Sequence, residues 1–222
     1  MIRFDKVSFS YNSKKILDNV DLYINNDEFL FVVGESGIGK TTLFKLMYFE
    51  VIPTSGTVFF ENFSSDNIDV QEIPYLRRRI GVVFQDFKLM QDRDTFDNIS
   101  LPLEIIGDKK DTIKKKVLDV ASRVGLLDKL NKKPFDLSGG EQQRIAIARA
   151  IVNKPEVVIA DEPTGNLDPI ISMDILKLLN EINRRGTAVI IATHNFELVR
   201  KLRDKRIVQV KDQKLYEVKI RT

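Results

Sequence analysis

The stretch Gly34-Glu35-Ser36-Gly37-Ile38-Gly39-Lys40-Thr41 matches the phosphate-binding pattern G-x-x-x-x-G-K-[ST] at every fixed position. The apolar run 29–33 before it is typical of a buried strand, and residues 41–47 after it have the spacing of an amphipathic helix. A strand, a glycine loop and a helix in this order form the unit in which the pattern binds a nucleoside triphosphate. A glycine-rich turn with a surface lysine is the alternative, but it does not account for the flanking strand and helix.

The residue types in this loop predict which atoms hold the phosphates. Glycines adopt backbone angles closed to other residues, so the main chain can close around phosphate oxygens, and the helix N-terminus directs free N–H groups at the anion. We expect Lys40 to reach the β- and γ-phosphates and the Thr41 hydroxyl to bind Mg²⁺. The predicted ATP-binding residues of the loop are Gly34, Glu35, Ser36, Gly37, Ile38, Gly39, Lys40, Thr41 and Thr42.

The composition limits the class of protein. The chain has 222 residues, enough for one sizeable α/β domain, which we predict to span residues 1–222. It has no cysteine, which excludes disulfides and thiolate chemistry and is compatible with a reducing cytoplasm. Residues 1–6 are too charged for a signal peptide, and no stretch is long enough to span a membrane. We therefore expect a soluble protein whose contact with a membrane requires a partner.

The charge balance gives little reason to expect nucleic acid as a partner. The 35 basic and 32 acidic residues leave a net charge of +3, too small to predict direct binding of nucleic acid. Basic residues do cluster, and such runs are usually solvated helix faces. Contact with an anionic membrane surface or an acidic partner is the alternative. The runs are residues 77–79, 109–110, 114–116 and 203–206.

Hydrophobic periodicity outlines the rest of the chain. Helical spacing from about residue 95 to 125 predicts a helical subdomain, placed at approximately 86–150 between strands of the sheet, with breaks at Pro102 and Gly107. Alternating or continuous apolar runs predict strands, and Tyr11 is expected in the turn after the first of them. The predicted strands are residues 2–9, 20–24, 29–33, 57–60, 80–84, 156–162 and 188–192, with a final hairpin from 206–210 and 214–218.

A second segment, Leu137-Ser138-Gly139-Gly140-Glu141-Gln142, stands before a helical stretch. Ser138 is well placed as the helix cap, and a serine with two glycines is most often only a helix start. The same features also describe a second anion site, with a hydroxyl, little steric bulk and free helix N–H groups.

Acidic and imidazole groups follow two of the predicted strands. Asp161 and Glu162 end a buried apolar run, which is costly for carboxylates unless they are paired or bound to a metal. Asp161 suits the aspartate that holds Mg²⁺ in phosphate-loop enzymes, and Glu162 suits a base that orients or deprotonates water. The alternative is a strand that simply enters a polar loop. His194, the only histidine in the sequence, ends another strand. A lone histidine is more often structural, but this one stands at the edge where open α/β sheets bind ligands, so it can contact the γ-phosphate.

These segments together resemble the nucleotide-binding domain of ABC-type ATPases: the glycine loop, Gln85, the Ser138 segment, Asp161-Glu162, Asp168 and His194 occur in this order. The resemblance implies a phosphate-loop α/β fold with a mostly parallel core sheet, an N-terminal antiparallel β-subdomain and an inserted helical subdomain. It further implies ATP hydrolysis with ATP and Mg²⁺ as cofactors, by a homodimer paired head to tail. Each ATP then lies between one phosphate loop and the signature residues Ser138, Gly139, Gly140 and Glu141 of the other copy.

The same resemblance assigns roles to single residues. Tyr11, otherwise a plain turn aromatic, is expected to stack on adenine. Gln85 contacts Mg²⁺ and the attacking water, His194 holds the γ-phosphate, and Asp168 lies in a loop that crosses to the opposite site. The implied catalytic residues are Glu162, His194, Lys40 and Gln85, and the implied metal-binding residues are Thr41, Gln85 and Asp161.

A finer likeness lies in residues 84–107, 150–155 and 162–168, which resemble the cell-division branch of these ATPases, the FtsE family. The branch implies an FtsX-like integral membrane subunit, an output directed at cell-wall hydrolases, and a cytoplasmic location on the inner face of the cell membrane. Residues 163–168 are shared with ATPases of lipoprotein release and macrolide export, which are the alternative.

Overall fold

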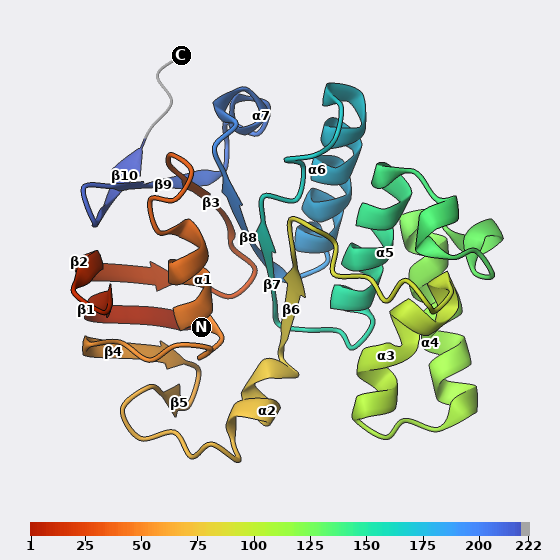
Figure 1. Cartoon of the computed structure of the whole chain (residues 1–222), viewed down its shortest axis with the longest axis horizontal. Coiled ribbons are helices and arrows are strands. Elements are labelled where there is room, and N and C mark those ends of the chain that lie inside the picture. The colour runs from red at the N-terminus through yellow and green to blue at the C-terminus, as the bar shows by residue number, and fades with distance from the viewer. Residues whose placement is uncertain (219–222) are drawn as a thin grey trace.

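The phosphate-loop strand lies inside a six-stranded sheet in the computed structural model, which describes residues 1–218 (Figure 1). The strand order is β10-β9-β3-β8-β7-β6, and all neighbours are parallel except the hairpin partner β10. Every residue of β3 and β8 is buried, as expected for parallel strands covered on both faces. The strands are β3 (Phe29–Val33), β6 (Ile80–Val83), β7 (Val157–Asp161), β8 (Ala188–Thr193), β9 (Arg206–Lys211) and β10 (Lys214–Val218).

A second, antiparallel sheet of four strands packs beside it, in the order β2-β1-β4-β5. Its strands are β1 (Ile2–Tyr11), β2 (Lys14–Ile24), β4 (Ser55–Phe60) and β5 (Phe63–Ser64). The predicted fold class is therefore confirmed. Tyr11 was expected in a turn, but it is the last residue of β1 and pairs with Lys14 across the two-residue turn at Asn12 and Ser13. The longer pairing of β1 with β2 extends both strands beyond the predicted limits.

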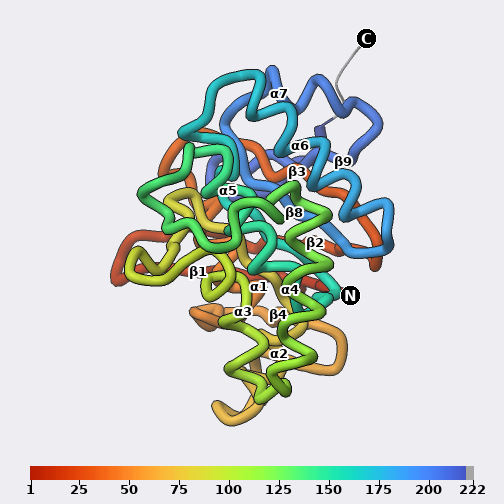
Figure 2. The backbone as a smooth tube through the Cα atoms, turned by 90° about the vertical axis from the view of Figure 1, so that its right-hand side faces the viewer, coloured from red at the N-terminus to blue at the C-terminus, as the bar shows by residue number. Residues whose placement is uncertain are grey.

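Helices cover both faces of the core sheet, and α3 and α4 pack on the outer side of α5 (Figures 1 and 2). None of the helices within residues 1–218 has the length and apolar character needed to cross a bilayer. The helices are α1 (Lys40–Met47), α2 (Ile73–Arg77), α3 (Thr95–Ile105), α4 (Lys110–Val124), α5 (Gly139–Ile151), α6 (Pro169–Arg184) and α7 (Phe196–Arg200), with short 3-10 turns at Leu127–Lys129 and Pro134–Asp136.

Pro102 does not break the helical segment, contrary to the prediction. It lies inside α3, where the ring removes one backbone hydrogen bond. Ile99 and Leu103 on either side of it are fully buried, so packing of the helix face outweighs the lost bond. The predicted break at Gly107 is confirmed, because α3 ends at Ile105, α4 begins at Lys110, and Gly107 between them has a φ of 81°.

Two hydrophobic clusters occupy the two faces of the core sheet, and alternate residues of β3 contribute to each. Phe31 and Val33 pack with residues of α5 and α6, whereas Leu30 and Val32 pack with α1 and the antiparallel sheet. Both clusters fix the end of β3, from which the phosphate loop leaves.

A glycine at a close contact between a helix and the core sheet gives a stability prediction. A Cβ at Gly81 in β6 would lie 2.4 Å from the carbonyl oxygen of Ala150 in α5, which no side chain tolerates without movement. Gly81→Ala should therefore lower the free energy of unfolding by about 1–3 kcal/mol, measured by denaturant titration.

Gly107→Ala is the matched control, because it meets no atom within 4 Å and bears only the cost of its positive φ. A Gly81 variant that is no less stable than the wild type would show that β6 and α5 separate easily.

Candidate functional site

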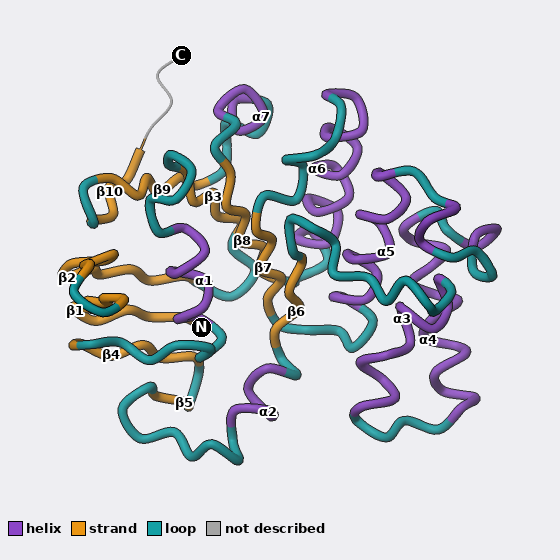
Figure 3. Tube along the Cα trace, viewed as in Figure 1, coloured by secondary structure: helices purple, strands orange, loops and turns teal. Residues whose placement is uncertain are grey.

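The loops that follow β3, β7 and β8 meet at one edge of the core sheet (Figure 3). The register aligns these strand ends, since Val33 pairs with Thr193 and Asp161 with Ala192. Open parallel sheets bind ligands at this carboxyl edge. The first loop ends at Gly39, which caps α1 with a φ of 120°, and a Cβ there would lie 2.8 Å from the Ile16 side chain. Only glycine fits this position.

Lys40 is folded back over the loop that precedes it. Its ammonium donates to the carbonyl oxygens of Gly34 and Glu35, at 2.9 Å each, and lies 3.3 Å from Oε1 of Glu162. The residue is only 5% exposed, so its charge needs these partners.

Thr41 and Asp161 form a pair of oxygen ligands beside this lysine. The Thr41 hydroxyl donates to Oδ2 of Asp161 at 2.6 Å. Burial raises the pKa of the Asp161 carboxyl above its usual value, the Thr41 hydrogen bond opposes this, and the nearby Glu162 charge adds to it. Hydroxyl and carboxylate oxygens are the donors that a hard divalent cation prefers.

Glu162 joins the lysine to the histidine. Its Oε1 also lies 3.0 Å from Nδ1 of His194, and the backbone N–H of His194 donates to its Oε2 at 3.4 Å. The residue has a φ of 46°, and its own N–H donates to the Ala192 carbonyl oxygen. A non-glycine residue in the left-handed region is strained and recurs at functional sites.

A cavity of about 360 Å³ opens beside the phosphate loop, Asp161 and Glu162, whereas His194 lines a neighbouring cavity that Glu162 also borders. Tyr11 lines the cavity at the phosphate loop from the end of β1 and is 43% exposed, and Gln85 lines it from the end of the β6 loop. Lys14 and Ile16 also line it, although the sequence analysis did not single them out. Their proximity depends on the β1–β2 hairpin, which folds over Gly39 and whose strand β2 begins before the strand predicted from the sequence.

The signature residues lie elsewhere. Ser138 caps α5 in a capping box: its hydroxyl accepts from the Glu141 N–H at 3.3 Å, and its own N–H donates to Oε2 of Glu141 at 2.9 Å. A Cβ at Gly140 would lie 2.7 Å from the Ile171 side chain, so the start of α5 packs against the start of α6. The predicted helix and its cap are confirmed.

Asp168 lies at the same contact between helices. It caps α6 by accepting from the backbone N–H groups of Ile170 and Ile171. Neither Asp168 nor any of Ser138, Gly139, Gly140 and Glu141 lines the cavity at the phosphate loop. One copy of the chain thus brings together the loop, Asp161, Glu162, His194, Tyr11 and Gln85, and leaves the signature segment apart.

Comparison with known proteins agrees with this arrangement. Residues 17–165 match the family model described as ABC transporter, a range that contains both carboxylates and ends before Asp168 and His194. The chain is 48% identical over 213 residues to the cell division ATP-binding protein FtsE of Bacillus subtilis, covering 96% of this chain and 93% of that protein. It is 44% identical over 217 residues to FtsE of Escherichia coli, covering 97% of each. A dimeric post-hydrolysis state of the ATP-binding cassette MJ0796, bound to ADP and Pi, matches with a TM-score of 0.88 and 33% identity over the whole of both chains.

The buried lysine gives the first test of this site. Lys40→Ala removes a positive charge that faces the cavity, so it should weaken ATP binding by about tenfold to a hundredfold, measured by titration calorimetry. Lys45→Ala is the control, because Lys45 lies one turn further along α1 and pairs with Glu50 at 2.8 Å. If the Lys40 variant folds and binds ATP as the wild type does, the lysine does not contact the phosphates.

Proposed function

The chain belongs to the ABC transporter family of ATPases, and we propose that it is the ATP-hydrolysing subunit of an FtsE-type complex that drives an FtsX-like membrane subunit in cell division. The observation that carries this proposal is the cluster of Lys40, Thr41, Asp161, Glu162 and His194 at one sheet edge. The relatives named above support the cell-division assignment.

ATP binds, in this proposal, across the phosphate-loop cavity. The loop N–H groups and Lys40 hold the β- and γ-phosphates, while Tyr11 stacks on adenine at the open end of the cavity. The ring of Tyr11 is already oriented by an edge-to-face contact with Phe9, with centroids 4.8 Å apart. Lys14, on the same hairpin, adds positive charge along the path of the phosphates.

Mg²⁺ fits the oxygen pair of Thr41 and Asp161, with Gln85 beside them in the same cavity. Within residues 1–218 no group of three or more His, Cys, Asp and Glu side chains forms a metal site. This suits Mg²⁺, which is usually held by one or two carboxylates together with substrate phosphates. When bound, the ion would neutralise charge that develops on the phosphate oxygens.

Glu162 is the proposed base. Its carboxylate accepts a proton from water as the water oxygen attacks the γ-phosphorus and the bond from that phosphorus to the bridging oxygen breaks, which releases ADP. Without nucleotide the carboxylate is held by Lys40 and His194. Both residues are proposed ligands of the γ-phosphate. When ATP binds, Lys40 and His194 contact the γ-phosphate in place of Glu162, so the carboxylate becomes free to bind water.

The separation of the signature segment from the cavity supports a head-to-tail homodimer. Ser138 and the free N–H groups of α5 then contact the ATP bound by the other copy, and Asp168 approaches from the same side. The MJ0796 cassette, similar over its whole length, is dimeric. ATP bridges the two copies, and loss of the γ-phosphate weakens the interface.

The membrane subunit completes the proposal. We propose that the chain lies at the inner face of the cell membrane, attached through an FtsX-like subunit, because its relatives named above are FtsE proteins of cell division. Opening and closing of the dimer then passes movement to that subunit, whose output controls cell-wall hydrolases.

Replacement of the base tests the catalytic part. Glu162→Gln keeps the shape of the side chain but cannot accept the proton, so ATP hydrolysis should fall by about 10²–10⁴-fold while ATP binding is retained. Light scattering after size exclusion should then detect a dimer that forms only with ATP and Mg²⁺.

The same variant with Ser138→Arg added is the control for the interface. It should bind ATP but remain monomeric, because the arginine occupies the space of the partner's phosphates. Normal turnover in Glu162→Gln would assign the base to another residue, and a dimer that survives the Ser138 change would place the interface elsewhere.

Affinity capture tests the cell-division part. The Glu162→Gln chain, held in its ATP state in membranes of the native host, should retain a membrane subunit of FtsX type, identified by mass spectrometry. Recovery of a permease of lipoprotein release or macrolide export would be consistent with the proposed ATP hydrolysis but would overturn the proposed role in cell division.

A further inference from the structure

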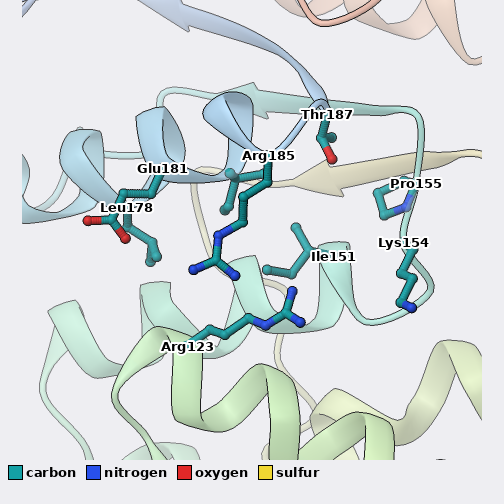
Figure 4. Close-up of a pocket in the computed structure, with 9 residues that line it drawn as sticks. Arg123, Ile151, Lys154, Pro155, Leu178, Glu181, Arg185 and Thr187 are labelled. Atoms are coloured by element: carbon teal, nitrogen blue, oxygen red, sulfur yellow. The ribbon is translucent and has the colours of Figure 1, made fainter.

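A second cavity lies at the opposite edge of the core sheet from the phosphate loop. It encloses about 300 Å³ between the C-terminal ends of α4, α5 and α6 (Figure 4). We call it the basic pocket, and it is lined by Arg123, Ile151, Lys154, Pro155, Leu178, Glu181, Ile182, Arg185 and Thr187. None of these residues takes part in the ATP site.

The floor of the basic pocket is apolar and only partly closed. Ile151, Leu178 and Ile182 are 9%, 7% and 8% exposed, so each presents a small area to the cavity. This floor can accept one or two apolar side chains, since 300 Å³ lies at the lower limit of small-molecule sites.

The rim carries three cations from three different elements: Arg123, Lys154 and Arg185. Figure 4 shows the guanidinium groups of Arg123 and Arg185 directed to the same opening over Ile151, while the Glu181 carboxylate points away. Arg123 pairs with Asp119 at 2.7 Å, but in the described chain neither Lys154 nor Arg185 joins an ion pair. The three positive charges exceed the single lining carboxylate.

Helix ends offer a partial explanation of these cations. Positive side chains are favoured near helix C-termini by about 0.3–1 kcal/mol, and three helices end here. The helix dipole favours a cation at each helix end independently. It does not explain why an apolar cavity lies between the three cations. The combination of floor and rim is complementary to a ligand that is apolar at its centre and acidic on both sides.

We propose that the basic pocket binds an acidic peptide segment of a partner protein, with an apolar side chain on the floor and flanking carboxylates at Arg123, Lys154 and Arg185. A small free anion fits less well, because exposed charges are screened by water and salt and the floor would stay empty. A peptide uses both features, and its affinity should fall as salt is raised.

The position of the basic pocket keeps its occupant out of direct contact with the ATP site. Pro155 and Thr187 stand before β7 and β8, whereas Asp161 and Thr193 stand at the other ends of the same strands. Strands of this length place the two edges roughly 15 Å apart. The occupant therefore blocks neither the phosphate loop nor the signature segment.

A labelled peptide tests the proposal on the full chain. The probe is a fluorescein-labelled synthetic peptide in which leucine is flanked by two glutamates on each side, with binding followed by fluorescence anisotropy. The wild type should bind it, and Arg185→Glu should weaken binding about tenfold or more with unchanged ATP hydrolysis. Arg184→Glu is the matched control, because this exposed neighbour does not line the pocket.

Two further probes separate the parts of the proposal. A peptide with serine in place of leucine should bind at least about tenfold more weakly if the floor takes part. The proposal is overturned by equal losses in the Arg184 and Arg185 variants, by absence of binding to the wild type, or by full competition from inorganic phosphate. Binding of phosphatidylglycerol vesicles that is lost only in Arg185→Glu would assign the pocket to a lipid surface instead.

Discussion

A buried positive charge is the constraint on which the candidate active site depends. The Lys40 ammonium is almost without solvent, and removing such a charge from water costs several kcal/mol unless partners replace the water. Two loop carbonyl oxygens and Glu162 fill that role, which fixes the shape of the phosphate loop and the strained backbone of Glu162 together. The loop is thus held ready for an anion before any nucleotide binds.

The neighbouring carboxylate of Asp161 is destabilised by its burial, because its partners do not fully replace water. Asp161 is shielded from water beside Glu162, and its raised pKa shows that burial outweighs the Thr41 hydrogen bond. A carboxyl whose folded-state pKa is raised lowers stability as the pH rises from its unfolded pKa through its folded pKa. At neutral pH the ionised Asp161 carboxylate therefore costs stability in the free chain, and a ligand that binds only the folded chain offsets this cost.

Sequence reasoning succeeded where the signal is local. The phosphate loop between β3 and α1, the Ser138 cap of α5 and the fully buried strands each follow from neighbouring residues. The predicted helix break at Pro102 was wrong. Burial of Ile99 and Leu103 stabilises the helix there, and this tertiary packing cannot be read from neighbouring residues. Sequence reasoning also missed Lys14 and Ile16, which reach the cavity because the hairpin that carries Tyr11 folds over Gly39 of the phosphate loop. Whether residues 1–222 act as one domain stays a prediction.

Helix α6 connects the two edges of the core sheet. Asp168 caps its first turn beside the signature segment, and Arg185 ends it at the basic pocket, about 24 Å away along a helix of 16 residues. Ile175, Leu179 and Ile182 on its inner face pack in the same cluster as the core sheet, so close packing along the helix links its two ends. If dimer closure shifts the Asp168 end, the cations at Arg185 shift with it relative to Arg123 on α4. A peptide that bridges those two arginines would bind the two nucleotide states with different affinity, and by reciprocity it would alter the closure of the dimer by the same free energy.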